Sequence, residues 1–205
     1  MTFIEFKDSL NKFTVFSVRD IRKIDPQFER RNLKNWQDKG YIKKVIKGHY
    51  IFTDLEINES VLYEIANKIY SPSYVSLEMA LSYYHLIPES VYQITSVATK
   101  KTKEFMTPIA SFNFRTLRPN LFFGYKIVSY DQKSFKIADG EKAILDYLYF
   151  NPRLQSEGDF KEMRIDAGSY NEYINQDTIR NYLEQYWQKK FRLRVNGFLR
   201  FMENA

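Results

Sequence analysis

A change of hydrophobic period at Gly40 constrains the fold of this chain more than any other feature of its sequence. Before Gly40, apolar residues recur at the three- and four-residue spacing of amphipathic helices. From Tyr41 to Phe52, strand-forming residues are instead mixed with lysines around Lys47-Gly48, a dipeptide that suits the tip of a hairpin. The first fifty residues therefore predict short helices followed by two antiparallel strands.

Three helices are expected before the hairpin. The first covers Thr2 to Lys12. The second begins at Ser17, a good N-cap, and ends near Asp25-Pro26, because proline disfavours a helical conformation in the residue before it. The third is expected from about Pro26 to Lys39, with Gly40 as its stop.

The third expected helix has two different faces. Leu33 and Trp36 share its apolar face with the stems of Glu29 and Arg30, and with Ile42 and Ile51 they would hold the module together. Groups that hydrogen-bond to bases and phosphates make up the opposite face: Gln27, Arg31, Lys34, Asn35 and Asp38.

The excess of positive charge lies in the same part of the chain. The formal net charge is +6, and residues 1–52 account for it because they hold 12 basic and 6 acidic side chains. A polyanion would be attracted to this region. A basic surface that is merely solvated, without a partner, is the alternative that charge alone leaves open.

The order of these elements and their charge are typical of a winged helix-turn-helix that binds duplex DNA. The third helix would enter the major groove, while the hairpin would follow the backbone or the adjacent minor groove. A domain of the same shape that binds a protein is the alternative. The candidate DNA-binding residues are Gln27, Arg30, Arg31, Lys34, Asn35, Lys43, Lys44, Lys47 and His49.

The rest of the chain indicates an α+β class, with strands grouped together and helices around them. We expect a DNA-binding domain over residues 1–56 and a second, mixed α/β domain over 57–205, with an antiparallel-type sheet and flanking helices. The expected helices cover 60–70, 76–86 and 140–150, with two or three more after Asp159. The expected strands cover 92–98, 108–115, 121–130 and 135–138.

Two segments of the second domain resemble a known family. Residues 65–89 resemble the AbiEi antitoxin family. Their sequence is Ile-Ala-Asn-Lys-Ile-Tyr-Ser-Pro-Ser-Tyr-Val-Ser-Leu-Glu-Met-Ala-Leu-Ser-Tyr-Tyr-His-Leu-Ile-Pro-Glu. Residues 137–149 resemble the same family. Its members usually have Ala-Asp-Pro-Glu-Lys-Ala-Leu-Leu-Asp at the positions of Ala138 to Asp146. Gly140 replaces the proline of that pattern. The resemblance covers roughly residues 13–150, and the Gly48-His49-Tyr50 end of the hairpin also fits it.

This resemblance implies the antitoxin of a type IV toxin–antitoxin system, which acts in phage defence by abortive infection. Members of the family repress their own operon by binding inverted repeats through the N-terminal domain. They counter a nucleotidyltransferase toxin without forming a stable complex with it. Their C-terminal domain is needed for antitoxicity and for cooperative repression, which implies self-association on DNA.

A second basic stretch follows Gln188 and contains no acidic residue up to Met202. Aromatic and aliphatic residues interleave with its cations, a pattern that favours a second nucleic-acid surface. A terminal helix whose long basic side chains extend to solvent is the alternative. The cations concerned are Lys189, Lys190, Arg192, Arg194 and Arg200.

No enzyme active site is expected. The chain has no cysteine and only two histidines, which excludes disulfides, zinc fingers and thiol nucleophiles. Asp139 and Glu141 suit a helix N-terminus, and Asp146 is spaced for a lysine or arginine partner. We therefore expect no catalytic residue, no metal and no cofactor. The absence of a signal-peptide pattern and of a long apolar run predicts a cytoplasmic protein without a membrane partner.

Two other functions remain as alternatives. One is a winged-helix regulator that senses a ligand in its C-terminal domain, where strands and aromatic residues could line a pocket. The other is a nucleic-acid-modifying enzyme that uses the basic module for targeting. A metal-dependent nuclease needs clustered carboxylates beside a lysine, and Glu141 with Lys142 does not supply them.

Overall fold

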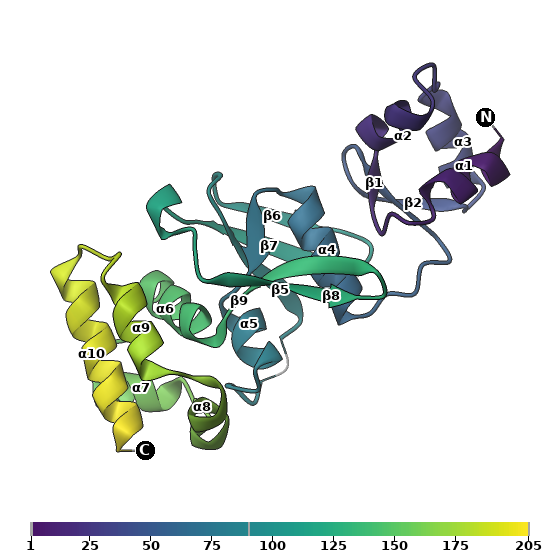
Figure 1. Ribbon diagram of the computed structural model, residues 1–205. Helices are drawn as coiled ribbons and strands as arrows, with labels where there is room; N and C mark the ends of the chain where they lie inside the picture. The colour runs from purple at the N-terminus through teal and green to yellow at the C-terminus, as the bar shows by residue number, and fades with distance from the viewer. Residues whose placement is uncertain (1, 90, 205) are drawn as a thin grey trace.

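The computed structural model describes residues 2–89 and 91–204. Figure 1 shows a small N-terminal unit at one end, a sheet in the middle and a group of helices at the other end. The two termini lie at opposite ends of the molecule. None of the described helices combines the length and the hydropathy that a membrane crossing requires.

The N-terminal unit, residues 2–52, contains three helices and a three-stranded antiparallel sheet in the order β1-β3-β2. Thr2 and Ser17 begin two of the helices with capping boxes, so local hydrogen bonds fix both starts. Gly48 at the hairpin tip has a φ of 87°, which favours glycine. The elements are α1 (Phe3–Leu10), β1 (Phe16–Ser17), α2 (Val18–Ile24), α3 (Arg31–Asp38), β2 (Ile42–Ile46) and β3 (His49–Phe52).

The third helix starts later than the sequence predicted. It begins at Arg31, and residues 26–30 form turns instead of a first helical turn opened by Pro26. Phe28 explains the difference, because this turn carries its ring into the core, where it is buried and stacks on Phe6 at a centroid distance of 6.0 Å. Glu29 and Arg30, expected on the apolar face, are exposed.

The N-terminal unit has an aromatic core. Phe6 is fully buried, and its ring centre lies 4.3 Å from that of Trp36 and 5.4 Å from that of Phe16. Leu33, Trp36 and Ile42 belong to this core as expected. The buried residues of the cluster are Phe6, Leu10, Phe16, Ile21, Phe28, Leu33, Trp36, Ile42 and Phe52.

The hairpin also has a second buried face. Ile51, expected in the core of the N-terminal unit, packs with Val15 and Val45 into the hydrophobic cluster of the rest of the chain. Next to it, the Thr14 hydroxyl donates a hydrogen bond to Glu64 of α4 (Glu59–Ile69), and this carboxylate also accepts one from the Tyr130 hydroxyl. The N-terminal unit is therefore in contact with the larger unit that follows residue 58.

The larger unit is built on a six-stranded sheet in the order β6-β7-β5-β4-β9-β8. The prediction of an antiparallel-type sheet was wrong in part, because β4 pairs with β9, and β5 with β7, in parallel. The other three pairs are antiparallel. The strands are β4 (Ser73–Val75), β5 (Gln93–Ala98), β6 (Lys103–Met106), β7 (Ser111–Thr116), β8 (Tyr125–Tyr130) and β9 (Lys133–Ala138).

Helices cover both faces of this sheet. Along β7, Phe114 faces α4 and lies against Tyr70, so its neighbours Asn113 and Arg115 point to the opposite face. The helices α5 and α6 lie on that opposite side, and the C-terminal helices pack on α6 and on one another. These helices are α5 (Glu78–Tyr83), α6 (Gly140–Phe150), α7 (Glu157–Glu162), α8 (Ala167–Tyr173), α9 (Gln176–Leu183) and α10 (Lys189–Glu203), with a 3-10 turn at Pro119–Leu121.

Several elements of the larger unit differ from the prediction. The strands β4 and β6 were not expected, and four helices follow residue 156 where two or three were expected. The helix predicted from Ser76 starts at Glu78, and Ser76 does not cap it, because its hydroxyl donates to Asp146. The Thr95 hydroxyl of β5 instead accepts the backbone N–H of Met79.

A polar network lies inside the core of the larger unit. Lys142 and Asp146, both with 0% side-chain exposure, form an ion pair one helical turn apart on α6. Asp146 also accepts hydrogen bonds from the hydroxyls of Tyr74 and Ser76, and the Lys142 ammonium contacts the Tyr186 hydroxyl. This confirms the lysine partner that the spacing predicted for Asp146.

Candidate nucleic-acid interface

A groove lies where α2, α3 and the hairpin tip of the N-terminal unit meet. Val18 and Leu33 supply its apolar floor, and cationic side chains reach it from α3 and from the hairpin. The lining residues are Val18, Arg30, Leu33, Lys34, Gln37, Lys47, Gly48 and Tyr50. The groove therefore brings together Arg30, Lys34 and Lys47, three of the residues predicted to bind DNA.

A second depression continues this groove along α2. It shares Val18 and Arg30 with the first one and adds three cations that the sequence analysis did not select: Arg19, Arg22 and Lys23. Their spacing of three and four residues puts all three on one side of α2, and this spacing is the signal that could have identified them. We call the two depressions together the basic groove.

Most cations of the basic groove have no acidic partner. Of the cations that line it, Lys23 is the one that forms a salt bridge among the described residues, with Asp20 at 3.9 Å. Arg19, Arg22, Arg30, Lys34 and Lys47 form none within residues 2–89 and 91–204. Their charge is available to an anionic partner.

The remaining predicted residues of the turn and α3 surround this groove. Gln27 is exposed on the turn before α3, where its N–H donates to Asp25. Asn35 is exposed on α3. Arg31 forms an ion pair with Glu29 at 2.6 Å, and both side chains are largely exposed, so a stronger anion could displace this contact.

The two lysines of β2 do not face the same surface. Lys44 is paired across the sheet with Tyr50, which lines the basic groove, whereas Lys43 is paired with Ile51, which faces the larger unit. Directly paired residues have their side chains on one face of a sheet, and successive residues alternate. Lys44 and Lys47 can therefore act together, while Lys43 lies on the other side.

His49 does not present a charged ring to solvent. It is half-buried, because β3 is the central strand and its backbone pairs on one side with Ser17 and on the other with Ile46. Burial lowers the pKa of His49, against the opposing effects of the Lys47 backbone and the Asp20 charge. A neutral, half-buried imidazole supports the hairpin and adds no positive charge to the groove at pH 7.

Four of the five cations predicted for the second basic surface are exposed on one helix, and the fifth is not. Lys189, Lys190, Arg192 and Arg200 are exposed on α10. Arg194 is not part of this surface, because it is partly buried and donates a hydrogen bond to the Leu148 carbonyl at 2.7 Å. Burial also lowers its pKa.

An exposed tryptophan adjoins this surface, and the sequence analysis did not select it. Trp187 precedes α10 and is 70% exposed, and the Arg118 guanidinium lies 5.4 Å from its ring centre. Arg118 and Trp187 are far apart in sequence, so no local pattern could have paired them. We call Arg118, Trp187, Lys189, Lys190 and Arg192 the C-terminal basic surface.

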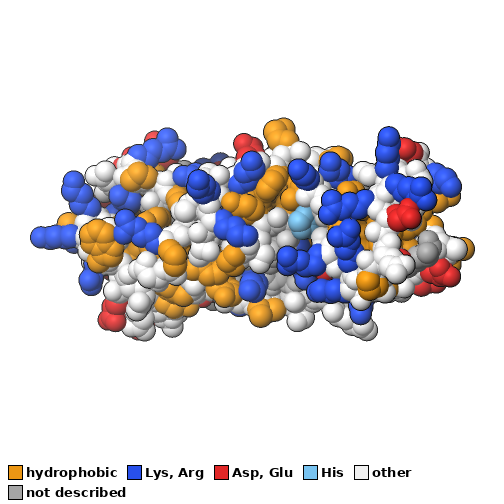
Figure 2. All heavy atoms as spheres, turned by 90° about the horizontal axis from the view of Figure 1, so that it is seen from above, with side chains coloured by type: hydrophobic (Ala, Val, Ile, Leu, Met, Phe, Trp, Pro, Cys, Tyr) orange, Lys and Arg blue, Asp and Glu red, His pale blue; other side chains and the backbone are white. Residues whose placement is uncertain are grey.

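Basic side chains extend along one face of the molecule. Figure 2 shows lysine and arginine side chains over the N-terminal unit and, at the other end, over the C-terminal helices, with few acidic side chains between them. Hydrophobic side chains are interspersed with the cations over the middle and the C-terminal part of this face. A long polyanion could contact both regions from the same side.

The carboxylates around α6 are engaged in structural contacts. Asp139 caps α6 by accepting the Lys142 N–H and also accepts the Tyr182 hydroxyl, and burial raises the pKa of Asp139 to about 6. Glu141 accepts the Asn175 N–H. In the part of the chain that the structure describes, no three histidine, aspartate or glutamate side chains gather as a metal site would require.

Comparison of the chain with protein-family models and with curated proteins gives no match. The geometry of the basic groove and of the C-terminal basic surface is therefore the main ground for a functional interpretation.

Proposed function

We propose that the N-terminal unit is a winged helix-turn-helix that binds duplex DNA. The observation that carries this proposal is the basic groove, in which cations without acidic partners converge from α2, α3 and the hairpin tip. The helices, the turn and the hairpin follow one another in the order that such a module requires. A surface that binds only protein would have no need for so many unpaired cations in one groove.

In this proposal α3 lies in the major groove. Lys34 and Asn35 would reach base edges, because they are exposed on α3 beside the basic groove. Arg19, Arg22 and Arg30 would contact phosphates on one side of the helix, and Lys47 at the hairpin tip would contact them on the other side. These contacts would position the module, while α3 would read the sequence.

We further propose that the chain is the antitoxin of a type IV toxin–antitoxin system and a repressor of its own operon. The two segments that resemble the AbiEi family form one neighbourhood, which supports this proposal. Val75 of the first segment pairs with Ile137 of the second, and Tyr84 donates a hydrogen bond to the Ala138 carbonyl. At Gly140, where the family pattern has proline, an added Cβ would lie 2.5 Å from Ile174 Cδ1, so a larger residue there requires the Ile174 side chain to shift.

The proposed role is regulatory and not enzymatic. It places the chain in the cytoplasm, with an inverted-repeat operator as its partner and with cooperative self-association on that DNA. Asp139, Glu141 and Asp146, the carboxylates closest to a catalytic set, are held by Tyr182, the Asn175 N–H and Lys142 respectively. These engagements favour a structural role for the three carboxylates over the nuclease alternative.

A mobility-shift experiment with the DNA upstream of its own gene tests the repressor proposal. At two salt concentrations and with competitor DNA present, we expect stepwise specific shifts. The double variant Arg30→Ala and Lys34→Ala should abolish them. The matched control is Lys12→Ala with Lys39→Ala, since both lysines are exposed and lie outside the basic groove. Equal loss in both double variants would reduce the interaction to nonspecific charge attraction.

Co-expression with a neighbouring nucleotidyltransferase tests the antitoxin proposal. Growth should be restored by the full chain, and affinity purification should recover no stable complex of the two proteins. Failure to restore growth, with specific operator binding intact, would leave a stand-alone transcriptional regulator.

A further inference from the structure

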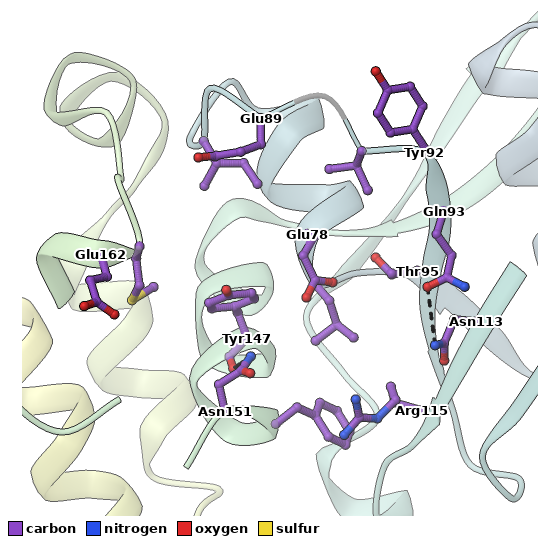
Figure 3. A pocket seen from close by; sticks show the side chains of 15 residues that line it. Glu78, Glu89, Tyr92, Gln93, Thr95, Asn113, Arg115, Tyr147, Asn151 and Glu162 are labelled. Atoms are coloured by element: carbon purple, nitrogen blue, oxygen red, sulfur yellow. Dashed lines mark hydrogen bonds between the residues drawn. The ribbon is translucent and has the colours of Figure 1, made fainter. Parts of the chain in front are cut away.

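A cavity of about 530 Å³ opens between the sheet and the helices of the larger unit, remote in sequence from the basic groove. Its size is within the range of small-molecule sites. Figure 3 shows that its side chains come from the strands, from α5 and α6, and from the end of α7. Its polar lining includes Glu78, Gln93, Thr95, Asn113, Tyr147 and Glu162.

One wall of the cavity is formed by amide and hydroxyl groups of β5 and β7. Thr95 and Asn113 are paired in the parallel register of these strands, so their side chains lie on the same face. The Asn113 amide nitrogen donates to Gln93 at 3.5 Å, as the dashed line in Figure 3 shows. The Asn113 oxygen is buried without a hydrogen-bond partner among the described residues.

Carboxylates give the cavity a negative character. Glu78 on α5 and Glu162 on α7 both line it, and neither side chain forms a salt bridge or a hydrogen bond within the described ranges. Glu89, the third carboxylate, is neutralised by Arg164 at 2.8 Å. Burial raises the pKa of Tyr147, and the charge of Glu78, which lines the same cavity, raises it further. A cation would be favoured beside Glu78.

Most of the remaining lining is apolar, and Arg115, Tyr92 and Asn151 are its other polar members. Leu77, Ile87 and Met163 contribute hydrophobic surface to the cavity. The Arg115 guanidinium keeps its charge and lies over the Phe150 ring, 4.9 Å from its centre, on the Phe150 side of the cavity. A ligand that fits therefore has a positively charged end that donates hydrogen bonds and a body of carbon atoms.

We propose that this cavity binds a small organic amine. The ammonium group lies beside Glu78, and the hydrocarbon part packs against Tyr147 and the apolar wall. Glu162 adds negative charge at the rim. This site is additional to the proposed DNA-binding function and does not depend on it.

Calorimetric titration with two matched probes tests the proposal. Phenethylamine and 2-phenylethanol have the same hydrocarbon body and differ in carrying an ammonium or a hydroxyl group. In phosphate buffer, which contains no competing amine, the full-length chain should bind phenethylamine and not the alcohol. Equal binding of the two probes would overturn the proposal, because the pocket would then select only the apolar body.

Variants locate the site. Glu78→Gln should weaken phenethylamine binding about tenfold or more, since a charged hydrogen bond is lost. Glu162→Gln, on a more exposed side chain, should weaken it less. The matched control is Glu184→Gln, because Glu184 is exposed and lies outside the cavity. Unchanged affinity in both cavity variants, each shown by circular dichroism to be folded, would contradict this site.

Discussion

The two units of the molecule have cores of different kinds. The N-terminal unit is held by stacked and edge-on aromatic rings around Phe6 and Trp36. The larger unit has an apolar core as well, but the Lys142–Asp146 ion pair lies within it. Burial of apolar side chains therefore stabilises both units, while the larger unit also depends on a complete set of buried polar contacts.

The buried pair is fully surrounded. Lys142 lies 5.2 Å from the ring centre of Phe123 and 5.8 Å from that of Tyr186, and Asp146 accepts from two hydroxyls besides the ammonium. Burial lowers the pKa of Lys142, and Asp146 opposes this effect. The contacts join Tyr74 of β4, α6 and Tyr186 of the C-terminal part, so the ion pair fixes how these elements meet.

The largest expected effect comes from breaking this pair. Asp146→Asn keeps the shape of the side chain but leaves the Lys142 charge buried without its counter-ion. We expect the free energy of unfolding to fall by about 3–5 kcal/mol, as measured by urea denaturation. The double variant Lys142→Met with Asp146→Leu should recover most of this loss. If it does not, the stability of this network depends on the hydroxyl contacts and not on the charges.

A pH titration should separate the two cores next. The pKa of Asp139 is raised by burial to about 6, so its folded form binds a proton more tightly than its unfolded form. Its contribution to stability is complete below the unfolded pKa and is lost as the pH rises through about 6. Relative to the wild type, Asp139→Asn should therefore gain about 2–3 kcal/mol between pH 4 and pH 7.

Asp20 of the N-terminal unit should show the opposite sign. Burial raises its pKa, but hydrogen bonds from Ser17 outweigh that effect and lower it overall. The stability that Asp20 contributes is thus present above its unfolded pKa and lost as the pH falls. Urea denaturation of the wild type, Asp139→Asn and Asp20→Asn at several pH values measures both trends. Parallel curves for the three proteins would contradict them.

The contact between the two units can be weakened separately. Thr14→Val removes the hydroxyl that donates to the buried Glu64 and leaves Tyr130 as its remaining donor. We expect a loss of about 1.5–3 kcal/mol, because the acceptor is charged. Hydrogen exchange followed by mass spectrometry should show faster exchange near Thr14 and α4. Thr53→Val, at an exposed position, is the control.

The smallest effect is expected from a conservative change in the aromatic core. Phe6→Leu keeps an apolar side chain among the rings and should cost about 1–2 kcal/mol in urea denaturation. The isosteric Asp146→Asn change should cost more than this non-isosteric one. A larger loss of stability for Phe6→Leu would mean that the aromatic core tolerates substitution less well than the buried ion pair.

Local signals predicted much of the secondary structure. Ser17 and Asp139 were recognised as helix starts, because a side chain that caps its own helix needs no distant partner. The start of α3 was not predicted, since the burial of Phe28 against Phe6 is a tertiary contact. The same is true of β4, whose three residues are a strand through pairing with β5 and β9.

The candidate site was predicted in part for the same reason. Exposed cations such as Lys34 and Lys47 could be selected by residue type and position. His49 and Arg194 could not be judged in this way, because neighbouring strands and the Leu148 carbonyl determine their burial. The contact of Arg118 with Trp187 depends on the fold of the larger unit.

The two tryptophans make the unlabelled protein its own fluorescent probe. Trp36 is buried in the N-terminal unit, while Trp187 is exposed beside Arg118 on the C-terminal basic surface. Emission from a buried indole lies at shorter wavelength than emission from one in water, so a single spectrum contains a separate component from each unit. Loss of the short-wavelength component would follow the opening of the N-terminal unit. Quenching of the long-wavelength component would report a nucleobase that stacks on the C-terminal basic surface.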